Sequence, residues 1–453
     1  MKKRLLLILS LALAQSAAFA QYTTSGDGTS YTIASLSGVP DAGIISYEQE
    51  EGMPLLYELF ADLTIAAGDK FVMDDDIMLL MAEGVSLTIE GEADFTLQNG
   101  STIVGLEGQA SVRINSAAAV NFEQVLFSVV GLELMGKGGV TVSDCSFTSH
   151  DGSTAAALYF ISAGAPSLVE RCTFINCKKA AIGSAANAPQ PLTIKDCTLT
   201  WNSSANNNIP QINVTAADPL VISGTTVVGI PENNMVGGIG ISNFMGYNAD
   251  VTISGCRIED NRYGIGLVGP AAKILLEGNT LMNNRYETNP MNGGSGISLY
   301  DPYQQTCAVV TSNHIEGSLW GITVIGCQDV NIGCLEEGDN YNPGQNVFRD
   351  NGFDGQLYDL YNNSTLTIYA QNNTWNVAEQ TEEQIESVIF HHNDDASLGE
   401  VIFMPAATVT AVSPSTLQKS PTASRQWFNL QGQRVDMPAR QGVYIVGGRK
   451  VLR

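Results

Sequence analysis

Apolar and polar residues alternate along most of the chain in short runs that recur every 20 to 34 residues. The clearest pair of copies is VTISGCRIEDNRYGI, beginning at Val251, and ILLEGNTLMNNRYE, beginning at Ile274. With Cys256 and Asn279 taken as equivalent anchors, the residues five before, three before and two after the anchor are apolar in both copies. Alternation with a period of two predicts strands that turn every second side chain toward a core.

The same register extends through ten copies. The anchors are Val125, Cys145, Cys172, Cys197, Thr225, Cys256, Asn279, Asn313, Asn346 and Asn373. A second short strand follows the anchor region, as in GIGI from Gly238, GIGL from Gly264, GISL from Gly296 and GITV from Gly321. A repeat of this size cannot bury its apolar face alone, so neighbouring copies must stack. The pattern predicts an all-β chain folded as a single parallel β-helix.

Over roughly Ala66 to Trp375 the repeat resembles the right-handed parallel β-helix proteins of the pectate-lyase-like superfamily. The right-handed sense of the coil is what this resemblance implies. The sequence lacks the GHG, NTD and RIK runs of polygalacturonase-like hydrolases and the RxPxxR run of pectate lyases. The resemblance therefore implies a fold and matches no named catalytic site.

The chain is expected to divide into six segments. They are a signal peptide (1–20), an N-terminal cap (21–66), the β-helix (67–376), a C-terminal cap with a short helix (377–405), a linker (406–424) and a β-rich tail (425–453). The first segment has a basic start, an apolar run and a small-x-small end, which is typical of a secretory signal. We therefore expect an exported protein, and no later apolar run approaches the roughly 20 residues of a membrane-spanning helix.

Both ends of the predicted solenoid need covering, because an open end exposes core and strand edges. Thr381 and Gln384 form a capping-box pattern that predicts the start of a short helix at the far end. In the last segment, NLQGQRV, GVYIV and KVLR resemble the C-terminal sorting domains of type IX secretion. This resemblance implies attachment at a bacterial cell surface or outer membrane.

The chain carries 46 acidic and 22 basic residues, a formal net charge of −24. Phosphate binding depends on clustered Lys and Arg, so nucleic acid is not expected as a partner. The negative electrostatic field of the chain also repels polyanionic glycans unless a divalent cation or a local basic patch intervenes. No cofactor or metal motif is present, and calcium stays open without one; Asp74, Asp75 and Asp76 are interpreted as a solvated turn.

Four of the eight cysteines, Cys145, Cys172, Cys197 and Cys256, occupy the inward anchor row. Strand spacing of roughly 4.8 Å separates their Cβ atoms by more than the about 3.8 Å of a disulfide, so we expect buried free thiols. Cys327 and Cys334 lie in or beside a loop and are the pair expected to form a disulfide if any pair does.

Two rows mark the corner that follows each anchor strand. Asn202, Asn261, Asn284 and Asn351 lie five residues after their anchors and are interpreted as a structural ladder, because Asn tolerates tight corners and bonds its stacked neighbour. Tyr263, Tyr286, Trp320 and Phe353 lie two residues further on. Alternation predicts that these rings face the core or its corner, and contact with a sugar ligand is the alternative.

One set of outward positions beside the anchors carries groups suited to catalysis. It comprises Arg257, Glu259, His314, Glu316 and Arg349. A uronic-acid lyase needs a base and a cation, which His314 with Arg257 or Arg349 would supply. Glu259 and Glu316, two coils and therefore roughly 9.6 Å apart, approach the spacing of about 6.5 to 9.5 Å found in inverting glycosidases. Ordinary surface charge accounts for the same residues.

Insertions at one corner favour binding instead, because extra residues in a solenoid form loops on one face. The three insertions are Ser203–Pro210, Ile230–Gly237 and Glu287–Ser295. Candidate binding residues are Asn206, Asn207, Asn208, Asn233, Asn234, Asn289 and Asn292, with outward Arg262 and Arg285. Tolerance of surface insertions would explain the loops equally well. The leading hypothesis is an exported or surface protein that binds an extracellular polysaccharide without catalysis; the alternatives are a polysaccharide lyase or hydrolase, and a structural or adhesive rod.

Overall fold

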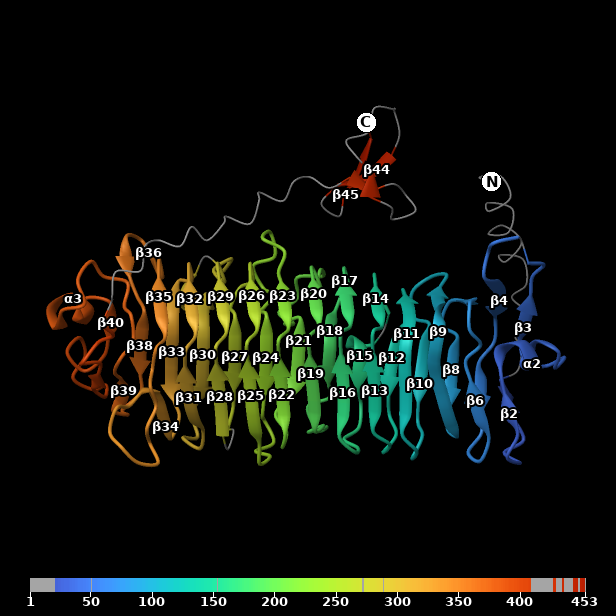
Figure 1. The fold of residues 1–453 in the computed structure, drawn as a ribbon, viewed down its shortest axis with the longest axis horizontal. Coiled ribbons are helices and arrows are strands. Elements are labelled where there is room, and N and C mark those ends of the chain that lie inside the picture. The colour runs from blue at the N-terminus through green and yellow to red at the C-terminus, as the bar shows by residue number, and fades with distance from the viewer. Residues whose placement is uncertain are drawn as a thin grey trace. The chain divides into compact units, whose positions relative to one another are not determined.

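The computed structural model describes residues 21–49, 51–152, 154–270, 273–287 and 289–408, together with four short strands near the C-terminus. The chain forms two compact units, residues 1–407 and 408–453. The first unit is a parallel β-helix in which the coils follow one another along a tube (Figure 1). The signal-peptide prediction and most of the predicted linker lie outside the described residues.

Most coils contribute one strand to each of three parallel sheets, here called sheets 1, 2 and 3. Sheet 1 contains β1 (Tyr22–Thr23), β5 (Leu63–Ile65), β8 (Ser86–Ile89), β10 (Ser111–Ile114), β12 (Gly131–Leu134), β15 (Ala156–Phe160), β18 (Ala180–Ser184), β21 (Ile212–Thr215), β24 (Ile239–Ser242), β27 (Ile265–Val268), β30 (Ser295–Asp301), β33 (Trp320–Gly326), β38 (Leu360–Asn363) and β40 (Ile389–Phe390). Sheet 2 contains β2 (Ser30–Tyr31), β6 (Lys70–Val72), the first parts of β9 (Glu92–Gly105) and β11 (Val120–Ser128), β13 (Val140–Ser143), β16 (Ser167–Glu170), β19 (Leu192–Lys195), β22 (Leu220–Ser223), β25 (Asp250–Ser254), β28 (Lys273–Glu277), β31 (Cys307–Thr311), β34 (Asp329–Gly333), β39 (Ile368–Ala370) and β41 (Val401–Ile402).

Sheet 3 contains β4 (Leu55–Leu59), β7 (Ile77–Met81), the second parts of β9 and β11, β14 (Ser146–Thr148), β17 (Thr173–Ile175), β20 (Thr198–Thr200), β23 (Thr226–Val228), β26 (Arg257–Glu259), β29 (Thr280–Met282), β32 (His314–Glu316) and β35 (Val347–Arg349). Outside these ladders, β3 (Ile44–Ser46) pairs antiparallel with β4, and β36 (Gly352–Phe353) pairs antiparallel with β37 (Gln356–Leu357). The all-β parallel solenoid expected from the sequence is confirmed.

A single left-handed residue before each anchor makes the bend from sheet 2 to sheet 3. The ten residues, with φ between 51° and 62°, are Gln124, Asp144, Arg171, Asp196, Gly224, Gly255, Gly278, Ser312, Gln345 and Asn372. Six of them are Gly, Asp or Asn, the types that adopt this conformation at least cost. The bend turns the anchor inward and begins the next strand in the same register.

The predicted register is confirmed coil by coil. Phe127, Phe147 and Phe174 are partners in adjacent strands, and their rings stack with centroids 4.7 Å apart. The same row continues through Ile258, which is fully buried, to Phe348. Aromatic stacking inside the coils adds about 0.5–1.5 kcal/mol per pair to the burial of the rings.

Buried asparagines satisfy the polar backbone groups at both corners. At the anchors, the Nδ2 groups of Asn279, Asn313 and Asn346 each donate to the Oδ1 of the next asparagine, the last being Asn373, over 2.9–3.0 Å. At the second corner Asn261 donates to Asn284 over 3.2 Å. Asn202 and Asn351 occupy the same buried row, so the predicted ladder is confirmed.

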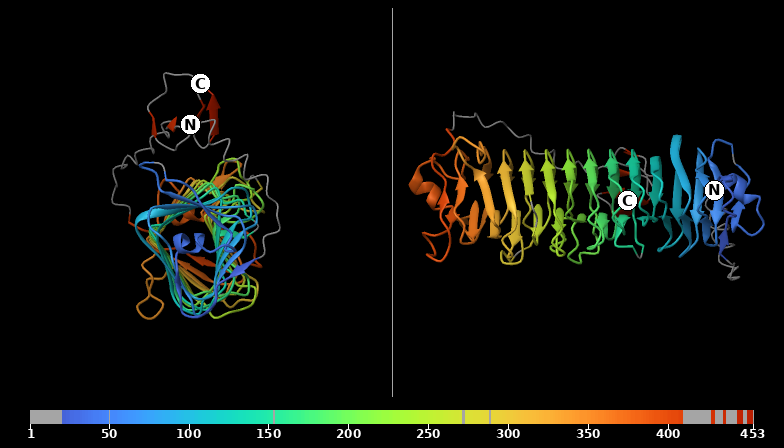
Figure 2. Two further views of the ribbon diagram at one scale, coloured as in Figure 1. Left: turned by 90° about the vertical axis from the view of Figure 1, so that its right-hand side faces the viewer. Right: turned by 90° about the horizontal axis from the view of Figure 1, so that it is seen from below.

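The ends of the tube are closed by short helices. Helix α2 (Ile33–Ser37) lies across the N-terminal end, as the end-on view of Figure 2 shows, and its Ile33 and Leu36 are buried. Within the expected cap, β1, β2 and β4 already pair in parallel with the next coil. Helix α3 (Glu382–Glu386) begins at the predicted N-cap Thr381 and buries Ile385. The Gln384 side chain accepts from Glu379 N–H, so only half of the capping box forms.

All eight cysteines are free thiols, and those of the anchor row are buried. Cys327 and Cys334, the pair singled out as the one to form a disulfide if any pair did, are not bonded to each other. Cys327 follows β33 of sheet 1, whereas Cys334 follows β34 of sheet 2 and pairs with Asn342. The five extended residues of β34 separate the two cysteines along different sheets, which is incompatible with the short Cβ–Cβ distance of a disulfide.

The second unit contains a four-stranded antiparallel sheet in the order β43-β42-β44-β45. Its strands are β42 (Trp427–Phe428), β43 (Arg434–Val435), β44 (Val443–Val446) and β45 (Arg449–Leu452). Two or three strands were expected here. Across the part of the chain that the structure describes, no helix is both long and apolar enough to span a membrane.

Candidate functional site: a groove on the outer face of sheet 1

A groove of about 660 Å³ runs along the outer face of sheet 1. Its floor is one row of outward side chains, with each residue in register with the next across adjacent strands. In order along the tube these are Tyr159, Gly183, Asn213, Gly240, Gly266, Ser298, Thr323 and Tyr361. Six small residues thus lie between two tyrosines, so the floor is low in the middle and carries a ring at each end of the row.

Tyr263 lies over the middle of this floor. A Cβ added to Gly266 would come within 2.8 Å of Tyr263 Cε2, and one added to Gly240 within 3.2 Å of its hydroxyl oxygen. The first distance is too short for a Cβ, and at Gly240 the prohibitive contact is with Pro210 Cγ at 2.5 Å, so the two glycines leave room for the Tyr263 ring and Pro210 on the strand backbone. Burial raises the pKa of Tyr263 to about 12, and the phenol is therefore neutral at physiological pH.

Tyr263 and Trp320 were expected to face the core or its corner, with contact to a sugar ligand as the alternative; both line the groove, which favours the alternative for these two rings. Alternation holds within a strand but not across the corner, where Asn261 already fills the inward position. The chain then turns through Gly264, and β27 begins one residue later. The two residues between Asn261 and Gly264 are therefore free to project outward.

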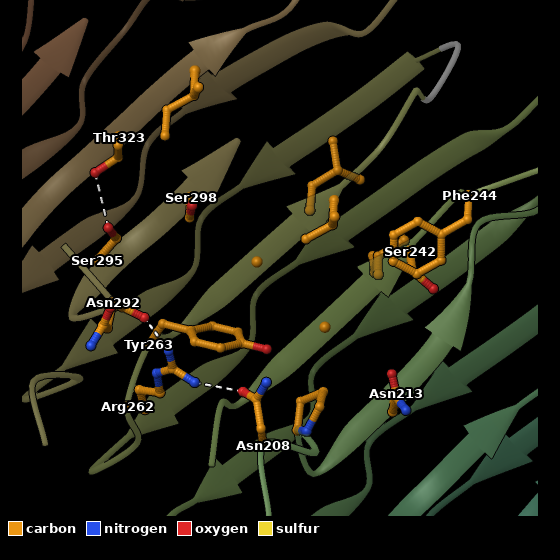
Figure 3. A pocket seen from close by; sticks show the side chains of 18 of the residues that line it. Asn208, Asn213, Ser242, Phe244, Arg262, Tyr263, Asn292, Ser295, Ser298 and Thr323 are labelled. Atoms are coloured by element: carbon orange, nitrogen blue, oxygen red, sulfur yellow. Dashed lines mark hydrogen bonds between the residues drawn. The ribbon is translucent and has the colours of Figure 1, made fainter. Parts of the chain in front are cut away.

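One wall of the groove is built from the first and third predicted insertions, and Arg262 bonds residues of both, as Figure 3 shows. Its Nη1 donates to Asn208 Oδ1 over 2.5 Å, and its Nη2 donates to the backbone oxygen of Asn292. The Arg262 Nε lies 3.9 Å from a carboxylate oxygen of Glu287. Arg262 thereby joins the first and third insertions, which lie on either side of it along the tube.

Aromatic side chains also mark the C-terminal end of the groove. The Trp320 ring stacks on Tyr361 with centroids 5.0 Å apart and touches Tyr358 at 4.6 Å. Trp320 Nε1 donates to the backbone oxygen of Pro290 over 3.0 Å, which fastens the third insertion to the wall. Phe244 also lines the groove and is 69% exposed.

Several polar side chains in the groove have no partner within the described chain. Asn213, Ser242, Ser298 and Asn363 are partly or fully exposed, and no hydrogen bond from their side chains is formed to described residues. Ser295 and Thr323, in contrast, bond each other over 2.9 Å. The groove therefore offers amide and hydroxyl groups beside aromatic faces.

Of the nine predicted binding residues, Asn208, Asn292 and Arg262 line the groove. The other six lie outside the groove lining. Asn206 accepts from the Met235 N–H and donates to Asn234, and Asn289 accepts a bond from within its own loop. Asn207 is exposed, Asn233 is partly buried, and Arg285 donates to the backbone oxygen of Gly352. Arg262 and Arg285 thus make different contacts, and only Arg262 lines the groove.

The predicted catalytic row lies on sheet 3, away from the groove lining. Arg257 is paired with Glu259 of the same strand, and His314 Nε2 lies 2.7 Å from Glu316. Thr280 and Met282 stand between the two pairs, one coil from each. Arg349, one coil beyond Glu316, is exposed.

No group of three or more His, Cys, Asp or Glu residues suited to holding a metal occurs among the described residues. In the predicted acidic turn, Asp74 accepts from Ala34 N–H and Asp75 accepts from Gln98 and Asn99 N–H. These carboxylates therefore bond backbone groups of neighbouring segments.

The groove floor was missed at the sequence level, although a signal for it was present. In GIGI, GIGL, GISL and GITV the residue between the two apolar positions is Gly240, Gly266, Ser298 or Thr323. Four small residues at the same outward position of successive coils indicate a surface that must stay shallow.

A family model described as a right-handed beta helix region matches residues 80–227. Among solved structures, a double mutant of the periplasmic alginate epimerase AlgG is 12% identical with a TM-score of 0.43, and 85% of each chain is covered. The pectate lyase Pel9A is 11% identical with a TM-score of 0.23, covering 76% of this chain and 70% of that one. A search of curated protein sequences finds no match. The fold is a right-handed parallel β-helix, and likenesses at this identity concern the fold alone.

Proposed function

We propose that this protein binds a linear polysaccharide along the outer face of sheet 1 without cleaving it. The observation that carries the proposal is the row of small floor residues with aromatic rings above and at both ends of it. Eight strands contribute to the floor, and at about 4.8 Å per strand their seven intervals extend over roughly 34 Å. A channel of that length fits an extended polymer.

The chemistry of the lining suits sugars. Tyr263, Trp320 and Phe244 present apolar ring surfaces, and Asn213, Ser298 and Asn363 present unpaired amide or hydroxyl groups. Binding sites commonly combine aromatic lining with a few placed polar groups that fix orientation. A sugar ring offers both an apolar face and hydroxyls, so each type of group has a matching partner.

The lining offers few groups suited to catalysis, because burial raises the pKa values of its three tyrosines, Tyr159, Tyr263 and Tyr361, and so weakens them as bases at neutral pH. Among the described residues that line the groove there is no Asp, Glu, His, Lys or Cys. Glycoside hydrolysis commonly uses two carboxyl groups, and lyase chemistry needs a base near the reacting proton. The alternative row on sheet 3 pairs Arg257 with Glu259 and His314 with Glu316.

We further propose that the protein is exported and held at the cell surface through residues 425–453. The signal-like pattern of residues 1–20 and the sorting-like tail support this part of the proposal. A structural or adhesive rod is the remaining alternative, and it predicts no glycan binding in the groove.

The test is binding of the purified mature protein to a panel of polysaccharides, with new reducing ends and unsaturated products measured in the same samples. The variant Ser298→Tyr places an aromatic ring on the groove floor, where it would block the ligand. The change should be tolerated by the fold, because the Ser298 side chain is partly exposed and bonds no described residue. We expect this variant to lose at least tenfold in affinity. Its matched control is Thr252→Tyr, an outward and partly exposed position on sheet 2.

Equal binding by Ser298→Tyr and wild type would refute the groove as the site. Product formation that disappears in His314→Ala would establish the enzymatic alternative instead.

A further inference from the structure

We infer that the bound polymer is an uncharged glycan and that Arg262 is a strut between two loops, not a receptor for an anion. The inference rests on the proposed function and adds the chemical class of the ligand to it. It follows from three properties of the groove: its charge, the engagement of its one cation, and the field of the whole chain.

Arg262 is the one charged residue among the described residues lining the groove. Its Nη1 and Nη2 are occupied by Asn208 and by the backbone of Asn292. Its side chain is 14% exposed, and Glu287, at 12% exposure, lies at ion-pair distance. The Nε is buried against Gly293 without a hydrogen-bond partner in the described chain, and a ligand carboxylate that approached this guanidinium would also meet the Glu287 carboxylate.

The planar guanidinium suits this bridging task, because its fork holds two acceptors in fixed directions. Asn208 lies 54 residues before Arg262, and Asn292 lies 30 residues after it. The same side chain packs against the loop backbone, since a Cβ on Gly293 would lie 2.8 Å from Arg262 Nε. Arg262 therefore sets where the loop wall stands relative to Tyr263.

The net charge of the whole chain disfavours a polyanion, although the one charged residue among the described groove lining is a cation. The chain has a formal net charge of −24, so a uronic-acid polymer approaches a repulsive field. Beside the floor, the row beyond Tyr159 continues with Glu133, which is already paired with Arg113 over 2.9 Å. The unpaired groups that remain on the floor, Asn213 and Ser298 among them, are neutral and match hydroxyl groups.

The decisive experiment compares an array of neutral oligosaccharides and polymers (glucans, mannans, xylans) with uronic-acid ones (polygalacturonate, alginate), using the whole mature chain at two salt concentrations. We expect binding to a neutral polymer that changes less than twofold with salt, and no binding to the uronic-acid polymers. Arg262→Gln and Arg262→Lys are expected to weaken neutral binding alike, by about three- to tenfold. In both variants hydrogen exchange should rise in residues 203–210 and 289–295.

The Lys variant separates the two roles of Arg262. A receptor for anions would be rescued by Lys, because the positive charge is kept, whereas a strut is not, because the fork is lost. Salt-sensitive binding of a uronic-acid polymer that survives in Arg262→Lys and is lost in Arg262→Gln would overturn the inference. If Ser298→Tyr abolished that same binding, the proposed groove would still stand. Binding to no member of the array would overturn both.

Discussion

The asparagine ladder at the anchors makes a quantitative prediction about stability. Asn313 is 1% exposed. Its Oδ1 accepts from the backbone N–H of Asn279 over 3.0 Å and from the Asn279 side chain over 2.9 Å. Its Nδ2 donates to the backbone oxygens of Leu276 and Thr311 over 2.9 and 3.0 Å, and to the side chain of Asn346 over 3.0 Å. One side chain therefore bonds three successive coils.

Replacement of Asn313 by Ala removes these bonds and leaves the Asn279 N–H buried without its partner. It also removes the side-chain bonds to two buried carbonyl oxygens. A buried polar group left without a hydrogen bond costs about 1–3 kcal/mol. The unpaired Asn279 N–H and the weaker hydrogen bonding of the Leu276 and Thr311 carbonyl oxygens together cost about 3–5 kcal/mol. We expect the free energy of unfolding to fall by this amount.

The assay is urea denaturation followed by circular dichroism, with hydrogen exchange of the peptide covering 274–287 as a local readout. Cys256→Ala is the matched control in the same anchor row, because the Cys256 side chain makes only weak bonds to carbonyl oxygens and has no amide group. We expect this variant to lose about 1 kcal/mol of stability. Asn207→Ala, at an exposed loop position, should cost less than about 0.5 kcal/mol. A loss below about 1 kcal/mol in Asn313→Ala, with unchanged exchange at Asn279, would refute the reasoning.

Three further predictions concern pH and the groove. Burial raises the pKa of the Asp359 carboxyl from 3.8 to about 7, so the folded state holds this proton more tightly than the unfolded state does. The free energy of unfolding therefore falls as pH rises from about 4 to 7, by up to about 1.4 kcal/mol per pH unit. Urea denaturation across this pH range should show a smaller decline of the free energy of unfolding in Asp359→Asn than in the wild type. An equal decline in both would contradict the raised pKa of Asp359. Gly266→Val should displace the Tyr263 ring and lower glycan affinity about tenfold while circular dichroism stays unchanged; retained affinity would mean that the ring position is immaterial. Glycan binding should be constant from pH 5 to 9 and unaffected by EDTA, because no lining residue titrates there; calorimetry showing a pH or chelator effect would argue for an unrecognised ionisable or metal site.

Much of the fold was predictable because the information that specifies it is local. The offset of Phe147 or Ile258 from its anchor determines which way the side chain points, since alternation is a property of the strand itself. The buried thiols of Cys145 and Cys172 and the ladder through Asn261 follow from the same offset. The position of Cys327 and Cys334 in or beside a loop could not decide whether they pair, because β34 carries Cys334 onto another sheet.

The candidate site was predictable only in part. The corner that bears the insertions was identified, and Asn208 and Asn292 lie on the groove as expected for binding residues of those loops. Tyr263 was expected at the core or its corner, because alternation was extended through a corner at which the backbone turns, and it lines the groove instead. The role of Arg262 as a bridge was not foreseen, since its partners are 54 and 30 residues away.

The sequence by itself determined the coil, its register and the identity of the inward rows, because each depends on residues within a few positions of one another. Only the tertiary structure decided that small residues from successive coils between Gly183 and Thr323 form one continuous floor. These residues are far apart in the sequence and become neighbours only because the coils stack in register. The groove is therefore a property of the assembled coils and of no single one.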